Sequence, residues 1–446
     1  MSTKGVILFS QYSKFDWVYM FIMVIYMAQA TPETSRMIGT LSGNPIPLLL
    51  PIILTYILCI NHPISFNNKK FYFVLTLYGI WASSSLIKYG TFSTEELSYH
   101  FFMVYAITIA YIHNQIFGYK LVSIYEKIIV LLCKISIIGW GIAVFLPSSA
   151  SFFHLFPETR YGNHVLYIFN WMDPAKGQIY SGLLRNAGCS WEPGRFAIMI
   201  TLAIYCNLCQ NSIKFKDNKN IIWLLLALVT TQSTTGYTIA LVIYSIFLIK
   251  KFNAKYVFTF IFIITPIFYG LIQLDFMGDK VKTKIIEAQD VSRLNKSFEW
   301  HEGQNEKGEY LGSIDRFDAF VFEWMNIVHD PILGYGRNVE HSYFYNYITS
   351  NYVLANGLMK ILGMYGIPLG LYFFYILFCS SLTIAKRSSQ KKALGLMILF
   401  CLSSISYNIF TVPVFTSFWF YAFFGKYRIK RSSKEAFIKL KTQPIQ

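Results

Sequence analysis

Three charged side chains stand close together before an apolar run, in the stretch RNAGCSWEPGRFA that begins at Arg185. Pro193 suits the first position of a helix, which makes Glu192 the N-cap and places Arg195 in the first turn. The free N–H groups of a helix start attract anions, and arginine offers a rigid fork that matches phosphate oxygens. We therefore predict that Arg185 and Arg195 bind an anion, and that Glu192 orients an arginine or takes a proton from a hydroxyl. A salt bridge that anchors the helix is the simpler alternative.

A second charged group accompanies the stretch RFDAFVFEWMNIVHD, which opens at Arg316. Phe317, Phe320 and Trp324 recur at helical spacing, so we predict an amphipathic helix that lies on the membrane face. We predict a catalytic role for Arg316, with pairing to a neighbouring aspartate on a solvated face as the alternative. His341 follows this helix and is a candidate general base.

Glycines accompany the histidine in the turn DPILGYGRNVEHS. Such glycines permit tight turns, or let a ligand approach the backbone closely. One more arginine occurs in the earlier segment PETRYGNH. The residues predicted to contact substrate are therefore Arg160, Gly334, Gly336 and Arg337.

The elements that must position these groups are apolar. The chain has 446 residues, of which 54% are hydrophobic and 14% are charged, whereas soluble domains carry about 25% charged residues. A membrane-crossing helix needs roughly 20 apolar residues. We predict an all-α polytopic membrane protein of about twelve transmembrane helices, formed by the runs near 15–30, 45–60, 71–88, 97–115, 121–146, 191–210, 221–231, 237–250, 256–274, 352–385, 393–411 and 412–425. The long run 352–385 has GMYGIPLG in its middle, so we expect a kink or break there.

Charge is distributed as membrane topology requires. Residues 276–350 hold twelve acidic and eight basic residues, a net charge of −4. Because the whole chain has a net charge of +16, the rest of it carries +20, mostly in short links between apolar runs. Basic links mark the cytoplasmic side. Both termini, including the basic tail 426–446, are then cytoplasmic, and the segments 147–190 and 275–350 become long outer loops. This pattern argues against nucleic acid as a partner. We also expect no removed signal peptide at the N-terminus.

Metal and cofactor sites are not predicted. Of the seven cysteines, only Cys189 stands outside an apolar run, and we expect it to be exposed. The sequence has no zinc-type cluster, no phosphate-binding P-loop and no Asp-x-Asp pair that would hold a divalent ion on a sugar diphosphate.

Several motifs together resemble the superfamily of bacterial O-antigen polymerases and O-antigen ligases, which are membrane glycosyltransferases. They are RNAGCSWEPGRFA, the polar gap TQSTTGYTIAL (231–241), DRF with DPILGYG in the second long loop, and NGLMKILGMYGIPLG (356–370) at the start of the next apolar run. Each motif is loose, but their order along the chain is specific. The motifs cover roughly residues 180–380.

The resemblance implies a polymerase of the bacterial inner membrane that works on its periplasmic face. Its donor and acceptor would be oligosaccharide repeat units linked to undecaprenyl diphosphate, in contact with membrane lipid. A protein that regulates chain length is a further partner that the sequence neither indicates nor excludes. Functional arginines of the family lie in the two outer loops, and they match Arg185, Arg195 and Arg316 here. The reaction would be metal-independent, because arginines can stabilise the charge of a departing diphosphate.

Two other functions compete with polymerisation. Ligases of the superfamily, which transfer the glycan to a different acceptor, carry a histidine about eleven residues before a Gly-x-x-Gly motif. Counted back from Gly363, this position holds Tyr352, a departure that favours the polymerase. A transporter or flippase of precursors is the third reading. Its ionisable residues would lie at the membrane midplane, whereas here they gather in the outer loops.

Overall fold

The structure is a computed structural model, and it is mostly helical. It describes residues 13–28, 46–90, 92–156, 163–165, 168–172, 179–180, 183–248, 316–343, 356–388 and 392–425. The helices are α1 (Lys14–Ala28), α3 (Ile46–Asn61), α4 (Lys69–Tyr89), α5 (Thr94–Ile116), α6 (Lys120–Phe145), α7 (Ala150–Phe153), α8 (Pro193–Gln210), α9 (Lys219–Thr231), α10 (Thr234–Leu248), α14 (Arg316–His329), α15 (Gly357–Arg387), α16 (Gly395–Ser404), α17 (Pro413–Trp419) and α18 (Tyr421–Phe424). Short 3₁₀ turns include η4 (Phe215–Asp217) and η6 (Val339–His341).

The strands form two small antiparallel hairpins in the first predicted loop. One pairs β1 (Asn163–Val165) with β2 (Asn170–Met172), and the other pairs β3 (Ile179–Tyr180) with β4 (Leu183–Leu184).

Helices lie on eleven of the twelve predicted apolar runs, and the run 256–274 lies outside the described residues. Two of the described helices, α6 and α15, are long and apolar enough to cross a membrane by length and composition. The helical class is therefore confirmed, whereas the number of crossings stays a prediction.

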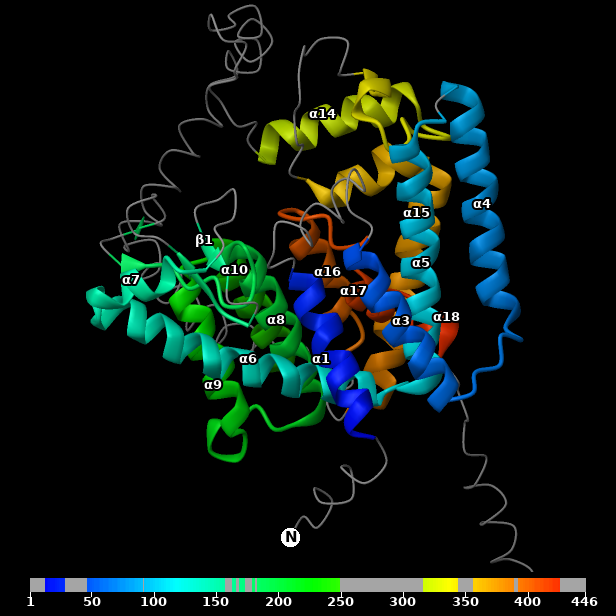
Figure 1. The fold of residues 1–446 in the computed structure, drawn as a ribbon. Helices are drawn as coiled ribbons and strands as arrows, with labels where there is room; N and C mark the ends of the chain where they lie inside the picture. The colour runs from blue at the N-terminus through cyan, green and yellow to red at the C-terminus, as the bar shows by residue number, and fades with distance from the viewer. Residues whose placement is uncertain are drawn as a thin grey trace, which may run out of the picture.

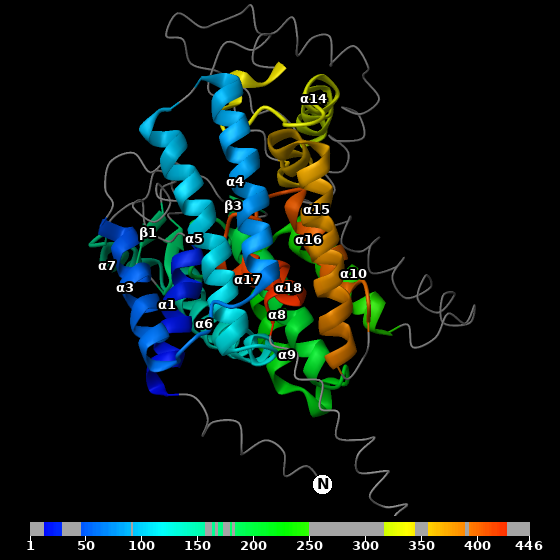
Figure 2. The same ribbon diagram turned by 90° about the vertical axis from the view of Figure 1, so that its right-hand side faces the viewer.

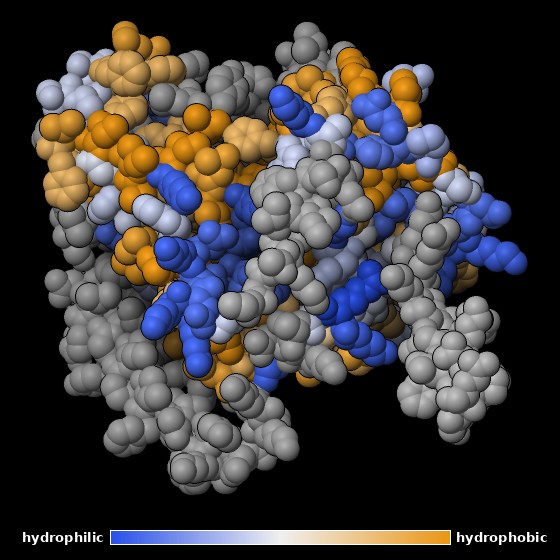
Figure 3. Space-filling view, turned by 90° about the horizontal axis from the view of Figure 1, so that it is seen from below, coloured by the Kyte–Doolittle hydropathy of each residue, from blue (hydrophilic) through white to orange (hydrophobic). Residues whose placement is uncertain are grey.

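The upright helices α4, α5 and α15 stand side by side, and α14 lies near their upper end, above α15 (Figures 1 and 2). Helix α14 packs on α15, while α8 packs against α6, α9 and α10 on the other side of the molecule. The lysine-rich starts of α4 and α9 lie at the end opposite α14 (Figure 1). Hydrophilic side chains gather across the middle of that end, between apolar patches (Figure 3). The lysines that begin α4 and α9 thus lie at the end of the molecule opposite α14.

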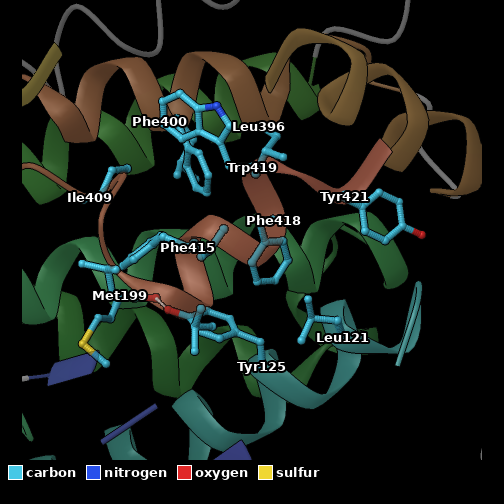
Figure 4. Close-up of a cluster of buried hydrophobic side chains, with 14 of the residues drawn as sticks. Leu121, Tyr125, Met199, Leu396, Phe400, Ile409, Phe415, Phe418, Trp419 and Tyr421 are labelled. Carbon is cyan, nitrogen blue, oxygen red and sulfur yellow. Dashed lines mark hydrogen bonds between the residues drawn. The ribbon is translucent and has the colours of Figure 1, made fainter. Parts of the chain in front are cut away.

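The core centres on α17, which lies between α8, α16 and the start of α6 (Figure 4). Phe415, Phe418 and Trp419 on α17 are almost completely buried. The hydroxyl of Tyr125 on α6 donates to the Met199 carbonyl of α8 over 3.0 Å (Figure 4). Such a core holds the start of α8 in place.

The last two apolar runs are shorter helices than predicted. Helix α16 ends at Ser404, and the final run divides into α17 and α18 at Phe420. Residues 403–408 read SSISYN, and serine and asparagine side chains compete with helical hydrogen bonds. The prediction of one continuous helix for each run was wrong here, because polar residues end α16 early.

The predicted break in the long run 352–385 is confirmed. Gly366 has φ 74° within α15, and Pro368 follows. The segment 330–336 lies against this break, where Tyr335 N donates to Gly363 O over 3.0 Å and Ile367 N donates to Pro331 O over 2.7 Å. The backbone groups that the break releases from the helix are thus satisfied by the DPILGYG motif.

Candidate functional site

The predicted start of α8 is confirmed, with Glu192 as N-cap in extended conformation and Pro193 as first residue. The Glu192 side chain makes no capping hydrogen bond. A Cβ on Gly194 would lie 2.5 Å from the Tyr407 hydroxyl and 3.4 Å from Oε1 of Glu192. The carboxylate and the phenol therefore both border the first turn of α8. Arg195, in the same turn, is half-buried.

Arg185 is tied to the end of α9. Its Nε donates to the Thr231 carbonyl over 3.1 Å, and the neighbouring Asn186 N donates to Thr230 O over 2.9 Å. Arg185 is half-buried, whereas the loop that follows is fully buried. Cys189, which we expected to be exposed, has 0% exposure. That expectation was wrong because the loop folds inward and Phe196 packs on Gly188.

The polar gap TQSTTGYTIAL separates α9 from α10. Gln232 ends α9 in the left-handed conformation, with φ 48°. Ser233 Oγ accepts from Gly236 N at the start of α10, and Thr235 Oγ1 lies 3.1 Å from Ser406 Oγ. The gap therefore brings the end of α9, the start of α10 and the turn after α16 together. We call Arg185, Glu192, Arg195, Gln232 and Tyr407 the α8 cluster.

A second cluster lies where α14 packs on α15. Glu323 of α14 has 0% exposure, and its carboxylate accepts hydrogen bonds from Tyr335 Oη over 3.0 Å and from Asn326 Nδ2 over 3.5 Å. The carboxylate also occupies the space that a Cβ on Gly363 would fill. Burial raises the pKa of Glu323 to about 7, against the opposing effects of the Lys360 charge and the two hydrogen bonds.

Two cations accompany this buried acid. Lys360, on the first turns of α15, interacts electrostatically with both Glu323 and Arg337. The Arg337 guanidinium lies over the Tyr99 ring, 5.5 Å from its centroid. We call Glu323, Tyr335, Arg337 and Lys360 the α14 cluster.

The pKa of Glu323 predicts how pH affects the junction of α14 and α15. The folded state keeps the proton up to about pH 7, whereas the unfolded chain loses it near 4.5, the ordinary pKa of a glutamate. Stability is therefore greatest below about 4.5 and falls as pH rises through about 7, by up to about 3 kcal/mol. Glu323→Gln cannot ionise and still accepts from Tyr335, so it should remove the slope. Hydrogen exchange of α14 amides at about pH 5 and about pH 8 measures this dependence of stability on pH. The same dependence in Glu323→Gln would contradict its assignment to Glu323.

His341 lies beside the second cluster. Its ring stacks on Tyr89 at 4.2 Å between centroids and 3° between planes. Burial lowers the pKa of His341, Glu340 acts in the opposite direction, and Lys88 adds to the lowering. The imidazole is therefore neutral at pH 7, which is the form that a general base requires.

The predicted substrate-binding glycines have a structural explanation. A Cβ on Gly334 would overlap the Gly363 and Met364 carbonyls of α15, and a Cβ on Gly336 would lie 2.7 Å from Ser85 Oγ. Both residues also have positive φ. Close packing thus explains both glycines, and substrate binding by them stays a prediction.

The start of α15 connects the two clusters. A Cβ on Gly357 would lie 2.6 Å from Cα of Asn408 and from the Tyr407 carbonyl, next to the α8 cluster. Lys360 follows about one turn later and belongs to the α14 cluster. Arg316 is the first residue of α14, but its side chain lies outside the described residues, as do Arg160 and Tyr352.

Glu323, Lys360, Gln232 and Tyr407 were not among the site residues predicted from the sequence. The sequence could have indicated Lys360, because a lone lysine in an apolar run needs a charged partner or contact with water. The sequence could not have indicated Glu323, because its position within the predicted helix does not show that this face of the helix is buried.

Within the described residues, no group of three or more His, Cys, Asp or Glu side chains could hold a metal ion. The chain matches no protein-family profile and no curated protein.

Proposed function

We propose that this chain is a membrane glycosyltransferase that polymerises oligosaccharide repeat units carried on undecaprenyl diphosphate. One observation carries the proposal: motifs distant in sequence pack around the start of α15. Arg185 contacts Thr231, Gly194 lies against Tyr407, Gly357 lies against Asn408, and Tyr335 N binds Gly363 O. The first of these contacts joins RNAGCSWEPGRFA to the polar gap, and the last joins DPILGYG to NGLMKILGMYGIPLG. Residues 407 and 408 link the two pairs, so all four motifs of the resemblance to the polymerase and ligase superfamily are connected.

Exposed apolar side chains support a membrane location. Large hydrophobic residues remain exposed along most of the length of α4, and others do so on α3 and α9. Exposing such an apolar surface to water is unfavourable, whereas contact with lipid is not. On α4 these residues are Tyr72, Phe73, Ile80 and Ile87. We propose the bacterial inner membrane, with about twelve crossings, cytoplasmic termini and the α14 end facing the periplasm.

The charges suit transfer from a lipid diphosphate. The departing diphosphate gains negative charge, and fixed guanidinium groups at a partly buried site stabilise it without moving. We assign this role to Arg185 and Arg195, together with Arg316 at the start of α14. Arg337 and Lys360 add positive charge nearby. No metal is required in this scheme.

The attacking sugar hydroxyl must lose a proton. Glu192 and the neutral His341 are both half-buried, so substrate can reach them. Glu323 has 0% exposure, and both of its hydrogen bonds are made within the chain, so it acts through its neighbours and not on substrate directly. We propose Glu192 as the first candidate base and His341 as the second.

Deletion of this chain tests the function through the surface glycan. We expect the deletion strain to display single capped repeats on a gel, with polymer restored by the intact chain. A flippase would leave no repeats, and a ligase would leave uncapped lipid-linked polymer. Either of these patterns contradicts the proposed polymerisation.

A further inference from the structure

Gln232 adopts a backbone conformation that glutamine disfavours. Its φ of 48° is the only positive value among the non-glycine residues that the structure describes. Helices commonly end in this left-handed conformation, but with glycine, which meets no steric penalty there. A glutamine at such a position suggests that its side chain serves a purpose, since strained residues concentrate at functional sites.

The side chain of Gln232 carries a second unfavourable feature. It is only 8% exposed, and its Oε1 has no hydrogen-bond partner among the described residues. An unsatisfied buried acceptor is costly and calls for an explanation. Turning the amide over replaces the oxygen by NH₂ but leaves a polar atom at the same position. Strain and a missing partner thus coincide at one residue.

The position of Gln232 indicates what the missing partner is. The carbonyl of the preceding residue, Thr231, accepts from Arg185 Nε, so the proposed diphosphate-binding arginine contacts the chain next to Gln232. Across the gap, Thr235 and Ser406 are 3.1 Å apart through their hydroxyls. Asn408 follows two residues later, and its Oδ1 also lacks a partner within the described part of the chain. Gln232 and Asn408 thus belong to the two segments that the Thr235–Ser406 hydrogen bond joins, and Arg185 contacts the first of these segments.

We propose that Gln232, together with Asn408, forms a sugar-hydroxyl subsite that holds the glycan next to its diphosphate. The proposal rests on the proposed function. An ionised phosphate accepts hydrogen bonds but does not donate them, so it can bind this amide only through the NH₂ group and leaves the oxygen as placed unsatisfied. A sugar hydroxyl both donates and accepts, and it therefore satisfies the amide in either orientation. Gln232 is a specificity-determining residue in this scheme, and Arg185 remains the phosphate ligand.

Two probes separate the glycan from the phosphate. The first is the free oligosaccharide that mild acid releases from the lipid-linked repeats of the deletion strain, and the second is inorganic diphosphate. Equilibrium binding of each probe is measured on the full-length protein in lipid nanodiscs. Gln232→Met keeps the side-chain length but removes the amide, so it should weaken oligosaccharide binding about tenfold and leave diphosphate binding unchanged. Arg185→Ala should show the reverse pattern.

Gln232→Gly distinguishes a binding residue from a helix cap. Glycine relieves the positive φ, so this variant should fold at least as well as the wild-type chain while losing oligosaccharide binding as Gln232→Met does. Gln210→Met is the matched control, because that glutamine donates to Cys206 O at the opposite end of α8. Wild-type oligosaccharide affinity in a folded Gln232→Gly protein would overturn the subsite, as would a wild-type protein that binds no oligosaccharide. Turnover of the lipid-linked repeat is assayed separately, so failure of polymerisation is distinguishable from failure of the subsite.

Discussion

Replacing Arg185 by alanine is expected to abolish polymer while the protein stays folded in the membrane. The Nε hydrogen bond to Thr231 O fixes the guanidinium beside the break between α9 and α10. Loss of one preorganised donor of this kind costs about 3 kcal/mol in the barrier, or roughly 10² to 10³ in rate. Asn186 keeps its own hydrogen bonds to Thr230, so the loop retains its anchor. The measurement is glycan length on a gel together with the amount of membrane-inserted protein.

Matched substitutions sharpen this result. Arg195→Ala and Arg316→Ala should also lose polymer, because the three arginines act on one developing charge. Arg185→Lys keeps the charge but loses the Nε hydrogen bond and the fork, so it should restore little activity. Arg387, at the far end of α15, contacts Tyr421, and Arg387→Ala should keep normal polymer. Normal polymer length in all three outer-loop variants contradicts the arginine assignment.

Local signals predicted local structure well. The start of α8 followed from Pro193, and the break in α15 followed from Gly366 and Pro368, because proline restricts its own backbone and glycine tolerates a positive φ. The predicted amphipathic helix is α14, and its exposed apolar side includes Phe320 and Trp324. Such features depend on a few neighbouring residues, so the sequence contains them directly.

Contacts between distant segments could not be predicted in the same way. Glu323 is buried because α14 lies on α15, and helical periodicity assigned no partner to that face. The unusual φ of Gln232 likewise results from how α9 meets α10. Arg185 and Glu192 could be proposed from charge in an apolar setting, but their neighbours Thr231 and Tyr407 required the folded chain. The sequence thus offered Arg185 and Glu192 as candidates, whereas the groups that hold them, and the buried carboxyl group of Glu323, became visible only in the folded chain.

Gly366→Ala is expected to disrupt the junction of α14 and α15. Gly366 has φ 74°, and a Cβ there would overlap the Ile332 carbonyl oxygen. Backbone does not yield as a flexible side chain does, so strain and overlap together should cost about 3 kcal/mol or more. Displacement of the segment 330–336 would also move Arg337, so polymer should be lost with stability.

The matched control for this substitution is Gly79→Ala in α4. A Cβ on Gly79 meets nothing within 4 Å, and alanine in a helix interior is favoured over glycine by about 0.5–1 kcal/mol. Thermal unfolding in detergent and proteolysis within residues 316–343 measure both variants. A Gly366→Ala protein with the wild-type unfolding temperature and protease resistance would contradict this prediction. It would show that α15 tolerates a side chain at its break, and that the contact with 330–336 does not hold the α14 cluster together.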